Sequence, residues 1–234
     1  VPWGWRWPKM KTLSVVPTVS VIIPVYNAEP WLAETIESVL GQTSPPQQVI
    51  VVDDGSTDQS AAVARRYAKY IQLAQQPNAG CAHARNRGVA LAQGALLAFL
   101  DADDGWLPEK LALQRAALAE APTVEAVFGQ IEQRCTADIV EQPLVFAANV
   151  QDGCTLDTLL IHRQAFHRIG LFDPKLHLTN GIEWLWRARR MALQTQILPQ
   201  LVAWRRIHGE NMSIRERTRV HAEYFRLIRQ IRHP

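Results

Sequence analysis

The chain has 234 residues, of which 47% are hydrophobic and 20% are charged. These values suit one compact domain, or two subdomains that share a core, and they argue against extensive disorder. The formal net charge is only +3, so the composition gives no reason to expect a nucleic-acid partner. No apolar run reaches the roughly 20 residues that a membrane-spanning helix needs. The three cysteines lack the spacing of a zinc site, which favours free thiols and a cytoplasmic protein.

The first residues have an unusual composition. Three of the eight tryptophans lie among residues 1–8 together with two prolines, and no signal-peptide core is present. Met10 stands shortly before the first predicted strand and is a candidate natural start. We therefore interpret residues 1–17 as a leader or a non-native addition, with a tryptophan anchor at a membrane interface as the alternative.

The first half of the chain alternates apolar, β-branched runs with stretches of helical periodicity. Val19–Val25 is almost continuously apolar, as in a strand that is buried on both faces of a parallel sheet. The predicted strands are Val19–Val25, Val49–Val52, Tyr70–Ala74, Ala95–Leu100 and Thr123–Gly129, and the helices between them are Trp31–Leu40, Asp58–Lys69, Cys81–Ala92 and Pro108–Glu120. This alternation predicts right-handed βαβ units, so we expect an α/β fold with a mostly parallel central sheet flanked by helices.

The second half loses this alternation. Residues 131–156 have no clear period and are predicted to form a loop with one strand. The later predicted elements are a short one at Leu159–Arg168, a helix at Ile182–Ala192, a strand at Ala203–Ile207 and a basic terminal helix at Arg215–Arg232. We divide the chain into a first subdomain of residues 18–130, a second of residues 131–213 and a C-terminal helix in residues 214–234.

Polar clusters follow three of the predicted strands. They are residues 24–29, residues 53–56 and residues 101–104. Ligands of open parallel sheets bind at the carboxyl ends of the strands, so we expect the three clusters to share one site. A nucleoside fits the first two clusters, because its base and ribose can donate hydrogen bonds to carboxylates and backbone carbonyls.

The third cluster, Asp101-Ala102-Asp103-Asp104, follows an almost wholly apolar strand. Neighbouring carboxylates repel one another and need a cation or strong donors to share. Their oxygens suit a hard cation such as Mg²⁺ or Mn²⁺, which would bridge them to a diphosphate. An Asp-x-Asp loop by itself is a weak signal, because acidic loops after strands are common.

Two familiar phosphate-binding signatures are absent after the first strand. Neither GxGxxG nor GxxxxGK[ST] occurs there, which argues against a dinucleotide-binding dehydrogenase and a P-loop phosphotransferase. Instead, Gly80 opens the third predicted helix, whose first-turn amides can face anionic oxygens, with Arg85 one turn further on. An ordinary helix start with a surface arginine is the plainer interpretation of this segment alone.

Four motifs follow one another along the chain. They are VSVIIPVYN at residues 19–27, VDDGSTD at residues 52–58, NAG at residues 78–80 with ARNRG at residues 84–88, and DADD at residues 101–104. In this order and spacing they closely resemble glycosyltransferase family 2, whose members have the GT-A fold. The resemblance is strong over residues 18–115. It continues more weakly at GLFD, residues 170–173, and RRIHGENMS, residues 205–213, which look like the family's acceptor-side landmarks.

The resemblance implies transfer of a sugar from a nucleoside diphosphate sugar to an acceptor hydroxyl, with inversion and with Mn²⁺ or Mg²⁺ as cofactor. UDP is the expected nucleotide because uridine is the family's commonest base. Residues 18–130 would bind the nucleotide sugar, and residues 131–213 a carbohydrate or lipid-linked acceptor. The implied donor-site residues are Pro24, Tyr26, Asn27, Glu29, Asp53, Asp54, Arg85, Asp101, Asp103 and Asp104. Asp103 would hold the metal, and His208 matches a position that joins the metal or diphosphate site in many members, with a structural histidine as the alternative.

One stretch departs from the family pattern. Inverting transfer needs a general base, which many members take from an acidic pair at the start of the helix after the GLFD landmark. Asn180 and Gly181 stand there instead, and Glu183 is the nearest carboxylate. Glu183 is therefore the predicted catalytic base beside Asp103. Alternatively, it pairs with Arg187 four residues further on, as helix-surface residues often do.

Two other functions compete with a glycosyltransferase. A sugar-nucleotide-forming nucleotidyltransferase needs a Gly-rich loop and a lysine after the first strand, where this chain has Tyr26-Asn27-Ala28-Glu29. The departure at Asn180 and Gly181 motivates the second rival, a catalytically impaired nucleotide-sugar-binding protein. The basic terminal helix suggests peripheral contact with an anionic membrane surface, and its plainer role is to pack on the domain with its arginines outward.

Overall fold

The computed structural model describes residues 17–137, 150–216, 222–225 and 229. Nearly all of the predicted leader and most of the predicted terminal helix therefore lie outside the described residues. Near the C-terminus the structure has the short helix α7 (Met212–Arg215) and a helical stretch at residues 222–225. Within the described ranges, no helix combines the length and the apolar character needed to cross a membrane.

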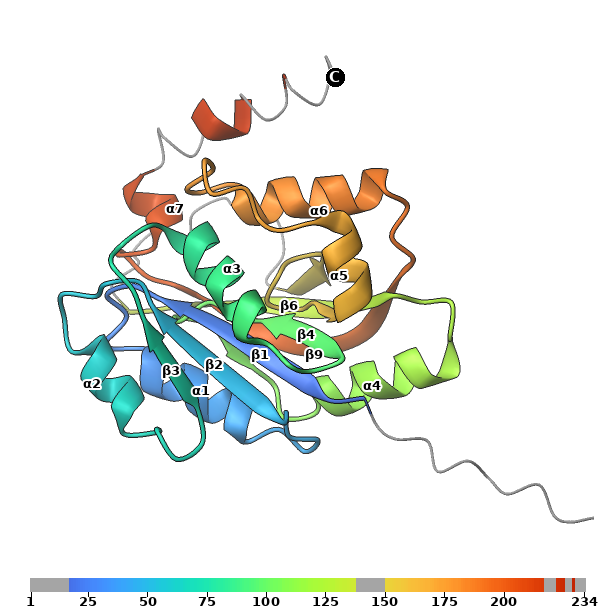
Figure 1. The fold of residues 1–234 in the computed structure, drawn as a ribbon, viewed down its shortest axis with the longest axis horizontal. Helices are drawn as coiled ribbons and strands as arrows, with labels where there is room; N and C mark the ends of the chain where they lie inside the picture. The colour runs from blue at the N-terminus through green and yellow to red at the C-terminus, as the bar shows by residue number, and fades with distance from the viewer. Residues whose placement is uncertain (1–16, 138–149, 217–221, 226–228, 230–234) are drawn as a thin grey trace, which may run out of the picture.

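A nine-stranded sheet lies between two layers of helices (Figure 1). The strand order is β3-β2-β1-β4-β8-β6-β9-β5, and β7 pairs with β6. The strands are β1 (Val19–Val25), β2 (Gln48–Asp53), β3 (Gln72–Gln75), β4 (Leu96–Phe99), β5 (Gly105–Trp106), β6 (Ala126–Cys135), β7 (Val150–Gly153), β8 (Leu160–His162) and β9 (Thr195–Ile207). The helices besides α7 are α1 (Leu32–Leu40), α2 (Ser60–Arg65), α3 (Cys81–Leu91), α4 (Lys110–Glu120), α5 (Arg163–Ile169) and α6 (Asn180–Arg190). The predicted α/β fold is confirmed.

Each face of the sheet has its own hydrophobic core, because successive residues of a strand point to opposite faces. Val21 and Ile23 of β1 pack on the face covered by α1, α2 and α4, while Ile22 points to the face covered by α3, α5 and α6 (Figure 1). All seven residues of β1 are buried. This burial on both faces is why the run at Val19–Val25 is almost uninterrupted by polar residues.

The sheet is parallel in its first part and mixed in its second. β3, β2, β1 and β4 run parallel to one another, as predicted. β8 then lies between β4 and β6 and runs antiparallel to both. The sheet thus includes strands from both predicted subdomains, and β6 does not pair directly with β4.

Several predicted boundaries need correction. The helix expected to reach Lys69 ends at Arg65, because the next amides bond three residues back, as in Tyr67 N–H to the Ala64 carbonyl, and the chain tightens into turns. The strand expected at Ala203–Ile207 begins at Thr195, and the strand expected to end at Gly129 continues to Cys135. These two strands pair along most of their length, a long-range contact that the local pattern does not show.

Candidate functional site

The three predicted polar clusters meet at one edge of the sheet. β1 pairs in parallel with β2 and β4, with Val25 opposite Asp53 and Ile22 opposite Phe99, so the three strands end side by side. Hydrogen bonds join the connections that follow β1 and β2. The Asn27 N–H donates to Ser56 Oγ (3.0 Å), and Asn27 Oδ1 accepts from the Thr57 N–H (2.8 Å).

The first cluster contains both a buried strand and exposed side chains. Pro24 lies within β1 opposite Val52, and Tyr26, which is 49% exposed, follows that strand. Asn27 has a positive φ of 50°, which lets the chain turn sharply after β1. Glu29 is exposed, and its carboxylate accepts a hydrogen bond from the Gln59 N–H (3.1 Å).

The second cluster uses its carboxylates to build the loop before α3. Asp54 is 2% exposed, and its two oxygens accept from Gln76 Nε2 (2.7 Å), the Ala79 N–H (2.9 Å) and the Gly80 N–H (2.7 Å). Asp53 is equally buried and accepts from the Ser56 N–H (3.0 Å) and Gln75 Nε2 (3.0 Å). Both carboxylates therefore accept hydrogen bonds from the chain itself, and these bonds shape the edge of the site.

Arg85 of α3 is a buried cation at this edge. Its Nη2 lies 2.5 Å from Asp101 Oδ1, and its Nη1 donates to Asn180 Oδ1 (2.6 Å). Burial disfavours the charged form, but the carboxylate of Asp101 outweighs it, so the pKa of Arg85 is raised and the guanidinium stays protonated. Arg85 is thus no surface arginine but an internal positive charge beside the acidic loop.

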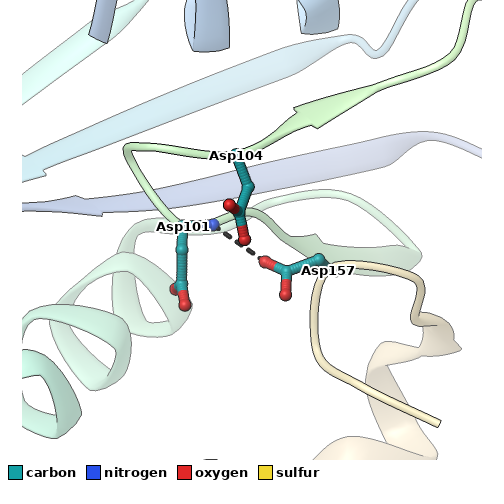
Figure 2. Close-up of side chains that lie close together, drawn as sticks. All are labelled: Asp101, Asp104 and Asp157. Carbon is teal, nitrogen blue, oxygen red and sulfur yellow. Dashed lines mark hydrogen bonds between the residues drawn. The ribbon is translucent and has the colours of Figure 1, made fainter. Parts of the chain in front are cut away.

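Three carboxylates gather after β4 (Figure 2). Oxygen atoms of Asp101, Asp104 and Asp157 all lie within 4.8 Å of one another, and the Asp101 N–H donates to Asp157 Oδ1 (3.0 Å). Burial, and then the charges of Asp103, Asp157 and Asp101, raise the pKa of Asp104 well above its usual range. Burial and the Asp101 charge raise the pKa of Asp157 to about 7. Asp104 and Asp157 therefore hold their protons more tightly than ordinary aspartates do, because burial and neighbouring like charges oppose ionisation.

Asp103 points to a second group of partners. Its Oδ2 lies 3.0 Å from His208 Nε2 and accepts a hydrogen bond from Asn211 Nδ2 (2.9 Å). Asn211 Oδ1 also accepts from the backbone N–H of His208 (2.7 Å), so these three residues form a closed group. The two residues predicted as metal ligands, Asp103 and His208, are brought into contact across 105 residues of sequence.

Arg206 fixes the acidic loop against the rest of the domain. Its backbone N–H donates to Asp104 Oδ1 (2.8 Å), and its Nε donates to the Asp103 carbonyl (3.1 Å). Its guanidinium lies over the rings of Trp31 (4.4 Å to the centroid) and Trp204 (4.8 Å). These contacts hold the loop that carries the predicted metal ligand.

Glu183 forms the ion pair with Arg187 that the sequence predicts as the alternative to a role as base. Its two oxygens accept from Arg187 Nε (3.0 Å) and Nη2 (2.8 Å). Arg187 also donates to the carbonyls of Ile169 and Leu171, each at 2.9 Å. The ion pair uses one lone pair of each Glu183 oxygen and leaves another free on each. The role of Glu183 as base stays a prediction.

Asp157 is the residue at this site that the sequence analysis missed. It follows the stretch of residues 131–156 that has no clear period, three residues before β8. Because β8 runs antiparallel to β4, the start of β8 lies beside the end of β4. A carboxylate two residues before the apolar run Leu159 to Ile161 was the available signal, but its use required knowing which strand β8 pairs with.

Comparisons with known proteins agree with this geometry. The family model described as glycosyl transferase family 2 matches residues 20–169. An uncharacterized glycosyltransferase of Rickettsia typhi is 33% identical over 196 residues, which are 76% of this chain and 60% of that protein. One of Rickettsia felis is 42% identical over 204 residues, 79% of this chain and 33% of that protein. The chain thus spans three fifths or less of the length of these relatives.

Solved structures show the same fold. S. aureus TarS 1–349 in complex with UDP-GlcNAc superposes with a TM-score of 0.68 and 23% identity, covering 84% of this chain and 60% of that one. The mannosyltransferase PcManGT of Pyrobaculum calidifontis in complex with GDP-Man and Mn²⁺ gives a TM-score of 0.65 and 23% identity, covering 85% and 59%. Both are glycosyltransferases of the GT-A type, so the predicted GT-A fold is confirmed. Together with the family model, these findings show that the chain belongs to glycosyl transferase family 2.

Proposed function

We propose that this chain is a metal-dependent glycosyltransferase that moves a sugar from a nucleoside diphosphate sugar to an acceptor hydroxyl with inversion. The observation that carries the proposal is the acidic loop at residues 101–104 beside the buried Arg85, at the carboxyl edge of a parallel sheet. Two fold neighbours have UDP-GlcNAc, or GDP-Man with Mn²⁺, in their complexes, which supports a sugar nucleotide as the donor. UDP is the first nucleotide to test.

The residues present fit a divalent cation. The buried carboxylates of Asp104 and Asp157 crowd together with that of Asp101, and the carboxylate of Asp103 lies 3.0 Å from the imidazole of His208. Oxygen and nitrogen donors of this kind suit Mn²⁺, and carboxylates suit Mg²⁺. Asp103 and His208 would hold the metal, which when bound would offset the charge of the diphosphate leaving group.

The protein's own groups have distinct proposed roles at the donor. The backbone around Pro24, with Tyr26, Asn27 and Glu29, would receive the base, while Asp101 would approach the ribose or the sugar. Arg85 supplies a fixed positive charge for the phosphates. Asp53 and Asp54 would act indirectly, since their oxygens already bind the loops that border the site.

Glu183 is the proposed general base on the acceptor side. It would take the proton of the acceptor hydroxyl as that oxygen attacks the anomeric carbon. The acceptor would be a carbohydrate or a lipid-linked molecule bound by residues 131–213. Any membrane contact through the basic terminal helix rests on residues largely outside the described ranges.

A second candidate function is supported by the ion pair of Glu183 and by the residues at positions 180 and 181. Glu183 is paired with Arg187, and Asn180 and Gly181 replace an acidic pair, which is also consistent with a nucleotide-sugar-binding protein of impaired activity. A thermal-shift screen of UDP, GDP and their sugars, each with Mn²⁺ or with EDTA, tests donor and metal binding. Release of nucleoside diphosphate on adding saccharide or lipid-linked acceptors then separates the enzyme from the binding protein. If Mn²⁺ and nucleotides produce no shift, the proposed function is wrong.

A further inference from the structure

Asn180 connects the second half of the chain to the cation of the donor side. Its side chain is buried, and its Oδ1 accepts a hydrogen bond from Arg85 Nη1 across 95 residues of sequence. Arg85 also contacts Asp101, so its guanidinium lies between one charged and one neutral acceptor. The residue that stands in place of an expected base is therefore in direct contact with the donor-side arginine.

The backbone before α6 fixes which way the Asn180 amide points. Its Nδ2 donates to the carbonyls of Leu176 (3.3 Å) and His177 (3.1 Å). Both partners are acceptors, so only an N–H group fits against them, and the amide oxygen is left to face Arg85. The Glu223 carboxylate holds the same turn by accepting from the Leu178 and Thr179 N–H groups, at 3.0 and 3.3 Å.

The neutral amide also keeps the local charge balanced. Arg85 with Asp101 carries +1 and −1, a net charge of zero, and a carboxylate at position 180 would make it −1. Oxygens of Asp104 and Asp157 already lie within 4.8 Å of an Asp101 oxygen. Moreover, Arg85 Nε is buried and makes no hydrogen bond within the described part of the chain. Another negative charge here would weaken attraction of the site for a phosphate.

We infer that Asn180 is a positioning residue that orients Arg85 and keeps its charge available to the diphosphate of the donor. The inference rests on the proposed function and deepens it. It assigns the phosphates, rather than the base, as the part of the donor whose binding depends on residue 180. A purely structural asparagine would affect all ligands of the site alike.

The test compares ligands that differ only in phosphate. Calorimetry in the presence of Mn²⁺ measures UDP, UMP and uridine binding to the unaltered protein, Asn180→Asp and Asn180→Ser. We expect Asn180→Asp to lower UDP affinity at least tenfold and Asn180→Ser to lower it about fivefold. For each variant, the loss of UMP affinity should lie between the losses for UDP and uridine, and uridine affinity should change less than twofold. The matched control is Asn86→Asp, the same change one residue from Arg85, where the amide instead bonds the Phe172 backbone in both directions. This control should leave the ratio of UDP to uridine affinity unchanged.

A double-mutant cycle decides whether residue 180 acts through Arg85, and it does not depend on Asn180→Asp folding. In an Arg85→Lys background, Asn180→Ser should change UDP affinity less than twofold, because the partner it orients is gone. Equal losses for UDP and uridine, the same ratio change in Asn86→Asp, or additive effects in the cycle would each overturn the inference while leaving the proposed function intact. If the unaltered protein binds none of the nucleotides, the proposed function falls, and this inference falls with it.

Discussion

The proposed donor side of this site, in residues 18–130, and the proposed acceptor side, in residues 131–213, are held by contacts of very different sequence range. On the donor side, Asp54 binds Gly80 across 26 residues, within consecutive strand–helix units. On the acceptor side, Asn180 binds Arg85 across 95 residues, and Asn211 binds Asp103 across 108. The donor side is thus built by neighbouring segments of one parallel sheet, whereas the acceptor side is placed onto it from later in the chain.

This difference predicts that substitutions on the two sides affect folding and catalysis to different degrees. Asp54 supports the loop that borders the proposed donor site, so its loss should affect stability and binding together. Glu183 instead is partly buried and has its partner on the same helix, so its loss should affect chemistry more than folding. Three predictions test this contrast, starting with the largest effect, and a fourth tests the charge state of a buried lysine.

Asp103→Ala should reduce turnover about 1,000-fold or more, because it removes the proposed metal ligand that His208 and Asn211 hold in place. Nucleoside diphosphate release with acceptor measures the loss, and the thermal shift produced by Mn²⁺ should vanish in parallel. His208→Gln is the matched variant at the partner and should weaken the Mn²⁺ shift less. An Asp103→Ala protein that keeps both turnover and the Mn²⁺ shift would rule out this metal assignment.

Asp54→Ala should lower the free energy of unfolding by about 3 kcal/mol, because three donors from residues 76–80 lose a buried charged acceptor. Urea unfolding measures the change. Nucleotide affinity should fall as well, since the loop before α3 borders the site. Asp58→Ala is the control at a partly exposed carboxylate, which accepts from the Glu29 and Ser60 N–H groups, and it should cost less. Unchanged stability in Asp54→Ala would contradict the view that donor-side carboxylates build the fold.

Glu183→Gln should reduce turnover about 100-fold with little change in nucleotide affinity, if Glu183 is the general base. Arg187→Gln is the matched variant, because it breaks the same ion pair but leaves the carboxylate in place. It should keep turnover and lose stability, since Arg187 also bonds two carbonyls. If Glu183→Gln turns over normally while Asp103→Ala does not, Glu183 serves the ion pair and not the chemistry.

Lys110 gives the smallest expected effect, in the pH dependence of stability. Its buried Nζ donates to Gln114 Oε1 (2.7 Å) and lies over the Trp106 ring, and burial lowers its pKa to about 7 from 10.5. Between these values the unfolded chain binds a proton that the folded chain lacks, so folded stability rises with pH. From pH 6.5 to 8.5, unaltered protein should gain about 2 kcal/mol relative to Lys110→Met in urea unfolding. A constant difference would mean that Lys110 stays charged when folded.

The amino-acid sequence by itself determined the donor side. β1, β2 and β4 are short apolar runs that each end in a polar cluster, and strands of a parallel sheet bring such ends to one edge. Both the strand assignment and the cluster are properties of a few contiguous residues. The i,i+4 spacing of Glu183 and Arg187 is equally local, so their pairing is predictable from helical periodicity alone.

Tertiary structure alone decided the rest. Whether β8 runs parallel or antiparallel depends on how its edges pair, and only the antiparallel pairing with β4 brings Asp157 to Asp101. Likewise, the sequence pattern marks Asn180 as a missing carboxylate, whereas the carbonyls of Leu176 and His177 show that this position requires an N–H donor. A local pattern indicates which residues are buried and which kind of element they form. Which side chains meet across 95 residues is set by the packing of the whole sheet and its helices.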